Sequence, residues 1–207
     1  MSFQPLNIIT SPVVLLQAEN IDTDRIIPAR FLKSVESTGF GKNLFHDWRY
    51  RPDGSPDPDF VLNKPEGQGK ILLTGKNFGC GSSREHAAWA LYQYGFRVVI
   101  SSGFADIFRT NALNNGLLPL EVTDQQLSGL METYMANPLA AWTVDLNQQL
   151  LIPAPANQHS TSTGSFTVPF SLNSFRKECL LHGSDLIDYL AGLKPRIIQF
   201  EANHHIK

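Results

Sequence analysis

Short apolar runs and amphipathic segments alternate regularly between Lys70 and about Ala136. The apolar runs are continuous, as in strands that are buried on both faces of a sheet, and they read KILLTG, RVVIS and LLPLEV. The intervening segments carry apolar residues at helical spacing, begin near capping residues and end near glycines. They predict helices over 82–95, 104–116 and 123–136. Because strand and helix alternate with short connections, we expect an α/β fold with parallel strands joined by right-handed crossovers.

The C-terminal part of the chain has a different pattern. WTVDLNQQLLIP (142–153) predicts two short strands around a polar turn, and FTVPF (166–170) predicts another. Two short helices are expected over 171–183 and 184–193, whereas EANHHIK at the end shows no pattern. The sheet is therefore expected to be mixed, within one domain that spans residues 1–207.

A long segment at about 39–65 is rich in Gly, Pro, Asp and aromatic residues but lacks clear periodicity. Loops of this length are usually functional or disordered, and the aromatic content argues against pure disorder. We expect this loop to pack either on its own domain or on a partner chain.

The composition excludes several classes of function. A net charge of -2 provides no basic patch for nucleic acid or anionic membrane, and no window approaches the ~20 apolar residues of a membrane span. The N-terminus lacks the pattern of a secretory signal, so a cytoplasmic protein is expected. The chain has 2 cysteines, Cys80 and Cys179, which is fewer than the thiolates that a cubane iron-sulfur cluster requires.

The stretch GKNFGCGSSREHAAWAL (75–91) carries the strongest functional signal. One interpretation is a capping box in which Ser82 and Glu85 satisfy the start of a helix. That interpretation leaves the glycines unexplained, because bare backbone next to a helix start also lets an anion approach N–H groups. The spacing matches neither a phosphate-binding loop nor a dinucleotide fingerprint. A carboxylate fits better, since Arg84 can offer two parallel N–H donors and a serine alkoxide could act as a base.

Two segments resemble the aconitase swivel domain: NIDTDRIIPARFL (20–32) and NFGCGSSREHAAWAL (77–91). Two more closely resemble the bacterial small subunits of isopropylmalate isomerase within that family: TGFGKNLFHDWRY (38–50) and FRKECLLHG (175–183). The resemblance covers nearly the whole chain in a consistent order. It implies a swivelling β/β/α domain with three layers around a largely parallel mixed sheet.

The resemblance also implies roles for individual residues. Ser82 matches the family's general base, Arg84 the arginine that binds a substrate carboxylate, and Ser83 a neighbouring hydroxyl. Asp24 matches an aspartate that supports proton handling together with a histidine of the partner. Asp22 is interpreted instead as part of an Asx-type turn. The family's 4Fe-4S cluster belongs to the large subunit, so this chain is expected to hold no metal and to form its active site with that partner.

The sequence departs from aconitase after the entrance segment, where it reads PARFLKSV (28–35). Aconitase has another substrate-binding arginine in this region, and that arginine has no secure match here. A site for an isopropyl group would be apolar, because a buried guanidinium facing an alkyl group would be left unpaired. The candidates for an apolar wall are Ile26, Ile27, Phe31 and Leu32, and the sequence does not choose between them.

The function that these matches imply is interconversion of 2-isopropylmalate and 3-isopropylmalate through 2-isopropylmaleate, in leucine biosynthesis. The chain would be a hydro-lyase subunit that is active only with the large subunit. Two alternatives stay open at this point: the small subunit of a related hydro-lyase of the homoaconitase or citraconate type, and a non-catalytic module that only binds an anion.

Overall fold

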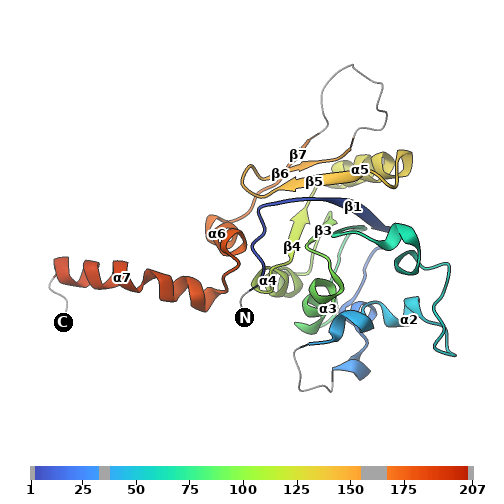
Figure 1. Ribbon diagram of the computed structural model, residues 1–207, viewed down its shortest axis with the longest axis horizontal. Coiled ribbons are helices and arrows are strands. Elements are labelled where there is room, and N and C mark those ends of the chain that lie inside the picture. The colour runs from blue at the N-terminus through green and yellow to red at the C-terminus, as the bar shows by residue number, and fades with distance from the viewer. Residues whose placement is uncertain (1–2, 33–37, 155–166, 205–207) are drawn as a thin grey trace, which may run out of the picture.

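The computed structural model describes residues 3–32, 38–154 and 167–204 (Figure 1). Within these residues, seven strands form one mixed sheet in the order β4-β3-β2-β1-β5-β6-β7. The strands are β1 (Ile8–Leu16), β2 (Ile71–Thr74), β3 (Val98–Ser101), β4 (Leu118–Glu121), β5 (Ala141–Asp145), β6 (Leu150–Ile152) and β7 (Val168–Pro169). The α-helices are α1 (Thr23–Ile26), α2 (His46–Arg49), α3 (His86–Tyr94), α4 (Asp106–Asn114), α5 (Asp124–Ala136), α6 (Ser174–His182) and α7 (Leu186–His204).

Strand β1 joins a parallel half of the sheet to an antiparallel half. Its residues 13–16 pair with β2 in parallel, and β3 and β4 continue that half. Its residues 8–12 pair with β5 in antiparallel fashion, and β6 and β7 follow. Pro12 lies at the change from one partner to the other, which is a place where a strand tolerates a residue without an N–H donor. Three of the strand pairs are parallel and three are antiparallel, so the expected mixed sheet is confirmed, and its parallel part is β1 to β4.

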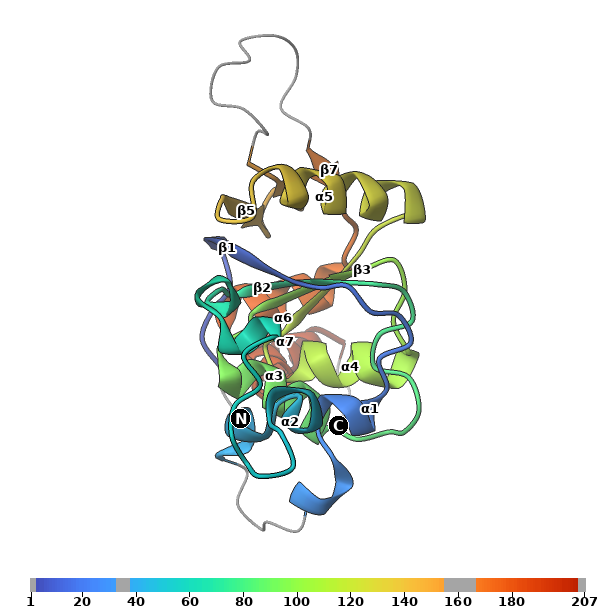
Figure 2. The ribbon, with the colours of Figure 1, turned by 90° about the vertical axis from the view of Figure 1, so that its right-hand side faces the viewer.

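Alternate residues of the parallel strands face two separate hydrophobic cores, as the period of a strand requires. On one face, side chains such as Leu72 and Val99 pack against α3, α4 and the segments around α1 and α2. On the other face, side chains such as Leu73 and Ile100 pack against α5, α6 and the antiparallel strands. Figure 2 shows α5 on one side of the parallel strands and α3 and α4 on the other. The result is an α/β fold, as the alternation of strands and helices predicts, and its three layers agree with what the family resemblance implies.

The alternation between Lys70 and Ala136 is confirmed element by element. Strands β2 and β3 are completely buried, as their continuous apolar sequences predict. Helix α5 begins with a capping box: the Thr123 hydroxyl accepts from Gln126 N while Gln126 Oε1 accepts from Thr123 N. Helix α3 ends at Tyr94 and is followed by Gly95 with a positive φ of 128°, but it begins at His86, later than predicted.

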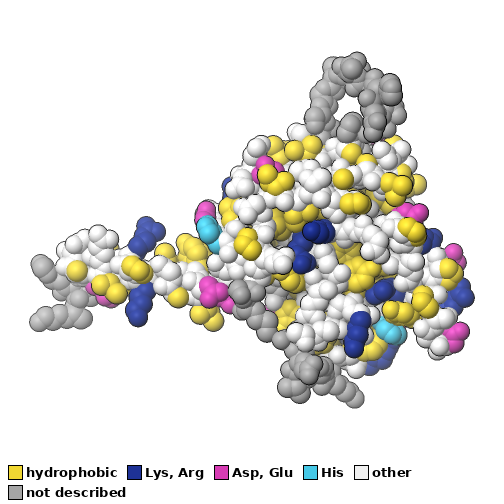
Figure 3. Space-filling view, viewed as in Figure 1, with side chains coloured by type: hydrophobic (Ala, Val, Ile, Leu, Met, Phe, Trp, Pro, Cys, Tyr) yellow, Lys and Arg dark blue, Asp and Glu magenta, His cyan; other side chains and the backbone are white. Residues whose placement is uncertain are grey.

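The C-terminal helix α7 is longer than the sequence predicts and extends to His204 (Figure 1). It projects from the rest of the molecule and contains Pro195. Figure 3 shows hydrophobic side chains along this helix. Ile187, Leu190 and Phe200 of α7 are each more than half exposed. Within the described residues, none of the helices combines the length and apolar character that a membrane span needs.

The segment at 39–65 packs on its own chain through its first part. Phe40 and Phe45 are buried, and Phe40 N donates to Gln93 Oε1 of α3 at 2.8 Å. Gly41 lies so close to the α3 backbone that a Cβ atom there would be 2.6 Å from Tyr94 N. The outer part, residues 51–59, is mostly exposed and turns back on itself through the bond from Arg51 N to Ser55 O.

Candidate active site

Two loops that follow parallel strands lie side by side and carry the signature residues. The loop after β1 and the loop after β2 are joined by backbone hydrogen bonds from Asn20 N to Lys76 O, from Gly79 N to Ile21 O and from Thr23 N to Cys80 O, at 2.9, 2.7 and 2.9 Å. Because the carboxyl ends of parallel strands meet at one edge of a sheet, this pairing brings DTDR (22–25) next to GCGSSR (79–84).

Gly79 and Gly81 make this close approach possible. Their φ angles are 76° and 97°, in the left-handed region that favours glycine. A Cβ atom on Gly79 would lie 2.2 Å from Cγ of the Phe108 side chain, which is buried. Gly79 is therefore required for packing against Phe108, and the glycines also leave backbone without side chains near the site. The N–H groups of Gly81 and Ser83 have no hydrogen-bond partner within the described part of the chain.

Ser82 is exposed and is held by Thr23. The two hydroxyl oxygens are 2.9 Å apart, and Ser82 N donates to Thr23 Oγ1 at 3.2 Å. Thr23 itself is only 2 % exposed and lies in the first turn of α1. Sequence reasoning missed Thr23, although it stands in the middle of the DTD motif. Its partner could be recognised only once the fold placed residues 59 positions apart in contact.

The capping-box interpretation of Ser82 and Glu85 is wrong. Ser82 turns to Thr23, and Glu85 Oε1 accepts from Asn115 Nδ2 at 2.9 Å. Asn115 in turn accepts from Trp89 Nε1, so Glu85 belongs to a contact between α3 and the end of α4. The hydroxyl of Ser82 is therefore not occupied in starting helix α3.

Arg84 and Asp24 form an ion pair at the edge of the same surface. Nη1 of Arg84 lies 2.7 Å from Oδ1 of Asp24, and Nη2 donates to Oδ2 at 3.4 Å. The hydrogen bond from Arg84, followed by the one from Ala29 N, holds the pKa of the Asp24 carboxyl below its usual value. The Arg84 side chain as a whole is 23 % exposed, although its Nη1 atom is buried. Asp22 accepts from Arg25 N at 2.7 Å and caps α1, in agreement with its interpretation as a turn residue.

The four candidates for an apolar wall do not lie together on the surface. Ile26 and Ile27 are completely buried in the core beneath the site, so their selection as substrate-contacting residues does not agree with the structure. Continuous apolar sequence in a short segment does not show which side chains point inward. Phe31 and Leu32 are partly exposed on and just after η1 (Ala29–Phe31) and stay candidates. Lys33, Ser34 and Val35 of the same stretch lie outside the described residues.

A shallow hollow of about 400 Å³ adjoins the Asp24 side of the site. Its lining includes Asp24, Pro28, Ala29, Arg30, Asp47 and Trp48. It therefore connects the DTDR loop with the aromatic segment around α2.

The described residues contain no group of three or more His, Cys, Asp and Glu side chains that could hold a metal ion. Cys179 is buried, and burial raises the pKa of its thiol, whereas Cys80 is partly exposed; both are free thiols. An iron-sulfur cluster does not fit the residues that this chain offers.

Comparison with known proteins adds a second, independent line of argument. Residues 9–125 match the family model described as Aconitase C-terminal domain. The 3-isopropylmalate dehydratase small subunit of Cytophaga hutchinsonii is 51% identical over 193 residues, which cover 93% of this chain and 92% of that protein. The corresponding subunit of Chloroflexus aurantiacus is 47% identical, over 97% of this chain and 96% of that protein.

The chain belongs to the aconitase family, among the 3-isopropylmalate dehydratase small subunits. A solved structure of 3-isopropylmalate dehydratase from Methanocaldococcus jannaschii superposes on it with a TM-score of 0.62, at 26% identity, over 94% of this chain and 99% of the other. The α/β fold and the resemblance to the aconitase family and its 3-isopropylmalate dehydratase small subunits are thus confirmed. The roles of Ser82, Ser83, Arg84 and Asp24 stay predictions that the geometry makes specific.

Proposed function

We propose that this chain is the small subunit of an isopropylmalate isomerase, a hydro-lyase that interconverts 2-isopropylmalate and 3-isopropylmalate through 2-isopropylmaleate. The observation that carries the proposal is the placement of the exposed Ser82 hydroxyl in the same short loop as Arg84, in a chain that is 51% identical over 93% of its length to a 3-isopropylmalate dehydratase small subunit. Arg84 would bind a substrate carboxylate, with Ser83 adding a hydroxyl.

Ser82 would act as the base that exchanges the proton on carbon. In the dehydration direction, the Ser82 oxygen accepts that proton, the electron pair of the C–H bond forms the new double bond, and the C–O bond on the adjacent carbon breaks as the hydroxyl leaves with its bonding pair. The partner's cluster would supply the Lewis acid for this departure. The Thr23 hydroxyl at 2.9 Å can donate to the serine oxygen when it carries negative charge, and the cationic Arg84 stands two residues away. In the hydration direction the same oxygen returns the proton to carbon.

We infer that a large subunit completes the site, because the cluster that serves this family does not fit the residues of this chain. The 4Fe-4S cluster would be carried by that partner. Asp24 would face the partner with one edge of its carboxylate, since its side chain is 58% exposed even while paired with Arg84. The two chains would form at least a heterodimer, and a cytoplasmic location stays a prediction.

The exposed part of the long loop is the proposed contact with the large subunit. Phe45 is buried, so deleting the segment around it would disturb the core and would not test an interface. Replacing residues 52–58 with a Gly/Ser linker of equal length removes the exposed side chains of the outer turn together with the Arg51–Asp57 ion pair. Loss of co-purification with the large subunit, together with unchanged thermal unfolding of the isolated chain, would support the contact; unchanged co-purification would exclude it.

The proposal is tested by anaerobic turnover of 2-isopropylmalate, followed through the ultraviolet absorbance of 2-isopropylmaleate. The assay compares this chain alone, the cluster-loaded large subunit alone, and the mixture. Activity confined to the mixture is expected. Turnover of homocitrate or citramalate in place of isopropylmalate would support the proposed active site but show that the substrate assignment is wrong. Full activity of the large subunit alone would mean that this chain is a binding module and not part of the catalytic site.

A further inference from the structure

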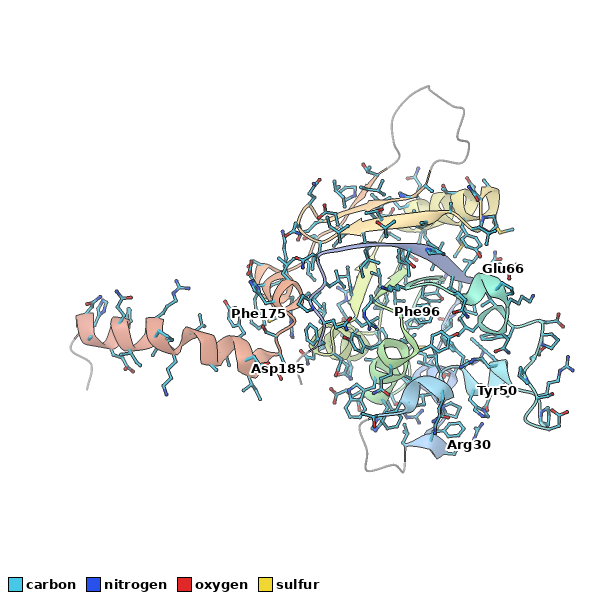
Figure 4. All side chains as sticks on the ribbon, in the orientation of Figure 1. Arg30, Tyr50, Glu66, Phe96, Phe175 and Asp185 are labelled. Carbon is cyan, nitrogen blue, oxygen red and sulfur yellow. The ribbon has the colours of Figure 1, made fainter. Side chains whose placement is uncertain are left out.

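A second charged cluster lies beside the candidate active site and has no role in the proposed reaction. Arg30 donates from Nη1 to Asp47 Oδ2 at 3.0 Å, and its Nη2 contacts Oδ1 of the same carboxylate. Nη2 also lies 3.2 Å from Nδ1 of His46. Both oxygens of Asp47 are thus engaged by one guanidinium, in the bidentate geometry that arginine and carboxylate favour. Figure 4 shows Arg30 at the outer edge of the molecule, on the segment before α2.

Aromatic packing fixes the orientation of this pair, although both side chains are about half exposed. The Arg30 guanidinium carbon is 4.7 Å from the centroid of the Phe31 ring, which is itself 4.7 Å from the centroid of the His46 ring. The hydrogen bond from Arg30 also lowers the pKa of the Asp47 carboxyl, so the carboxylate is ionised at neutral pH. The positive charge of Arg30 is therefore matched by a negative charge at hydrogen-bond distance.

The cluster faces the hollow that also contains Asp24. Two arginines line this hollow, and each is close to an aspartate: Arg30 to Asp47, and Arg25 to Asp22 with Nε 3.9 Å from Oδ2. Arg25 is further occupied by Trp48, whose ring centroid lies 5.5 Å from the guanidinium carbon. Three carboxylates and two guanidinium groups leave the hollow without net positive charge. An additional carboxylate of a ligand would find the Arg30 guanidinium already engaged by both oxygens of Asp47, and would meet the Arg25 guanidinium only beside Asp22 and Trp48.

We propose that Asp47 is a specificity-determining positioning residue, which occupies Arg30 and thereby keeps the hollow beside Asp24 from binding a third substrate carboxylate. The inference rests on the proposed function, in which Arg84 binds a carboxylate of a dicarboxylic substrate. An alkyl branch needs no charged partner, whereas a third carboxylate that loses water contacts needs one. Asp47 thus acts against the wrong ligand, by repulsion and by holding the arginine that would otherwise bind it.

The test is the affinity of the reconstituted two-subunit enzyme for tricarballylate, a tricarboxylate, compared with succinate, a dicarboxylate. Asp47→Asn removes the charge that holds Arg30 and is expected to tighten tricarballylate binding about tenfold, while succinate binding changes less than about twofold. Asp59→Asn is the matched control, because Asp59 is an exposed acid of the same loop and should leave both affinities unchanged.

Two further variants separate this role from a general effect of charge or folding. Arg30→Gln combined with Asp47→Asn should return tricarballylate affinity to the wild-type level, and Asp47→Glu should keep wild-type selectivity. Equal tightening of both ligands, or tighter tricarballylate binding that survives the loss of Arg30, would overturn the proposal. Calorimetry measures these affinities without turnover, so the two proposals can fail separately. Absence of isopropylmalate turnover would count against the proposed function. Unchanged tricarballylate affinity in Asp47→Asn would count against the role of Asp47 in specificity.

Discussion

The hydroxyl of Ser82 lies 2.9 Å from the hydroxyl of Thr23, a residue buried in the first turn of α1. This contact ties the loop after β2 to the loop after β1 at the atom to which we assign proton transfer. Because Thr23 is buried and its β-branched side chain is restricted at χ1, its hydroxyl can hold the exposed serine in a defined position.

Replacing Thr23 with valine should lower kcat about tenfold with little change in KM. The substitution preserves shape but removes the hydroxyl that accepts from Ser82 N and contacts Ser82 Oγ, and a hydrogen bond of this kind contributes about 1 kcal/mol. Thr23→Ser should keep most of the activity. Steady-state kinetics of the reconstituted enzyme checks this, and a Thr23→Val variant with normal kcat would show that the contact is only structural.

Asp24→Asn should reduce kcat/KM by about tenfold or more, because it removes the anionic partner that orients Arg84. Asp22→Asn is the matched control in the same motif. Its amide oxygen can still accept from Arg25 N, so kcat/KM should stay within about twofold of wild type. Equal losses in the two variants would mean that the motif matters for folding of the loop and not for the orientation of Arg84.

The lowered pKa of Asp24 predicts a specific dependence of stability on pH. Because the carboxyl is more acidic in the folded chain than in the unfolded chain, its pairing stabilises the fold above the unfolded pKa of about 4 and is lost as the pH falls through the folded value. Urea unfolding should therefore show a difference between wild type and Asp24→Asn that is full at pH 6 and shrinks toward pH 2. A difference that stays constant over this range would contradict the assignment.

Gly79→Ala should destabilise the isolated chain by about 3 kcal/mol or more. The new Cβ adds a clash with the buried Phe108 ring to the cost of a left-handed residue, which is about 1–2 kcal/mol by itself. Gly54→Ala is the control, because Gly54 has a similar φ of 81° but nothing within 4 Å of the added atom. Denaturant unfolding should show a larger loss of stability for Gly79→Ala than for Gly54→Ala. Equal losses of stability would mean that the left-handed backbone conformation, and not the clash with Phe108, causes the destabilisation.

Much of this fold follows from local sequence patterns. Strands β2, β3 and β4 have continuous apolar sequences, and Thr123 with Gln126 marks the start of α5. Strand β1 was not predicted, because Pro12 interrupts its apolar sequence at the point where its partner changes from β5 to β2. The length of α7 was missed because Pro195 and a polar end mask its helical spacing, and few contacts with the core support it.

The sequence predicted most of the residues of the candidate site but not the contacts between them. The motif around Ser82 and Arg84 was visible in the sequence, but its pairing with Thr23 and Asp24 depends on two loops that only the sheet brings together. The prediction that Ile26 and Ile27 contact the substrate was wrong because both side chains are buried in the core, which their apolar sequence alone does not reveal. Arg30 and Asp47, 17 residues apart, gave no signal before the structure placed them in contact.

The most direct test of the account is the kinetics of Ser82→Ala and Ser83→Ala in the complex with the cluster-loaded large subunit. Ser82→Ala should lose at least about a hundredfold in kcat on 2-isopropylmalate while still binding the large subunit, since it removes the atom that exchanges the proton. Ser83→Ala should mainly raise KM. Wild-type kcat in Ser82→Ala would contradict the assignment of Ser82 as the base and would leave this surface of the chain with a binding role only.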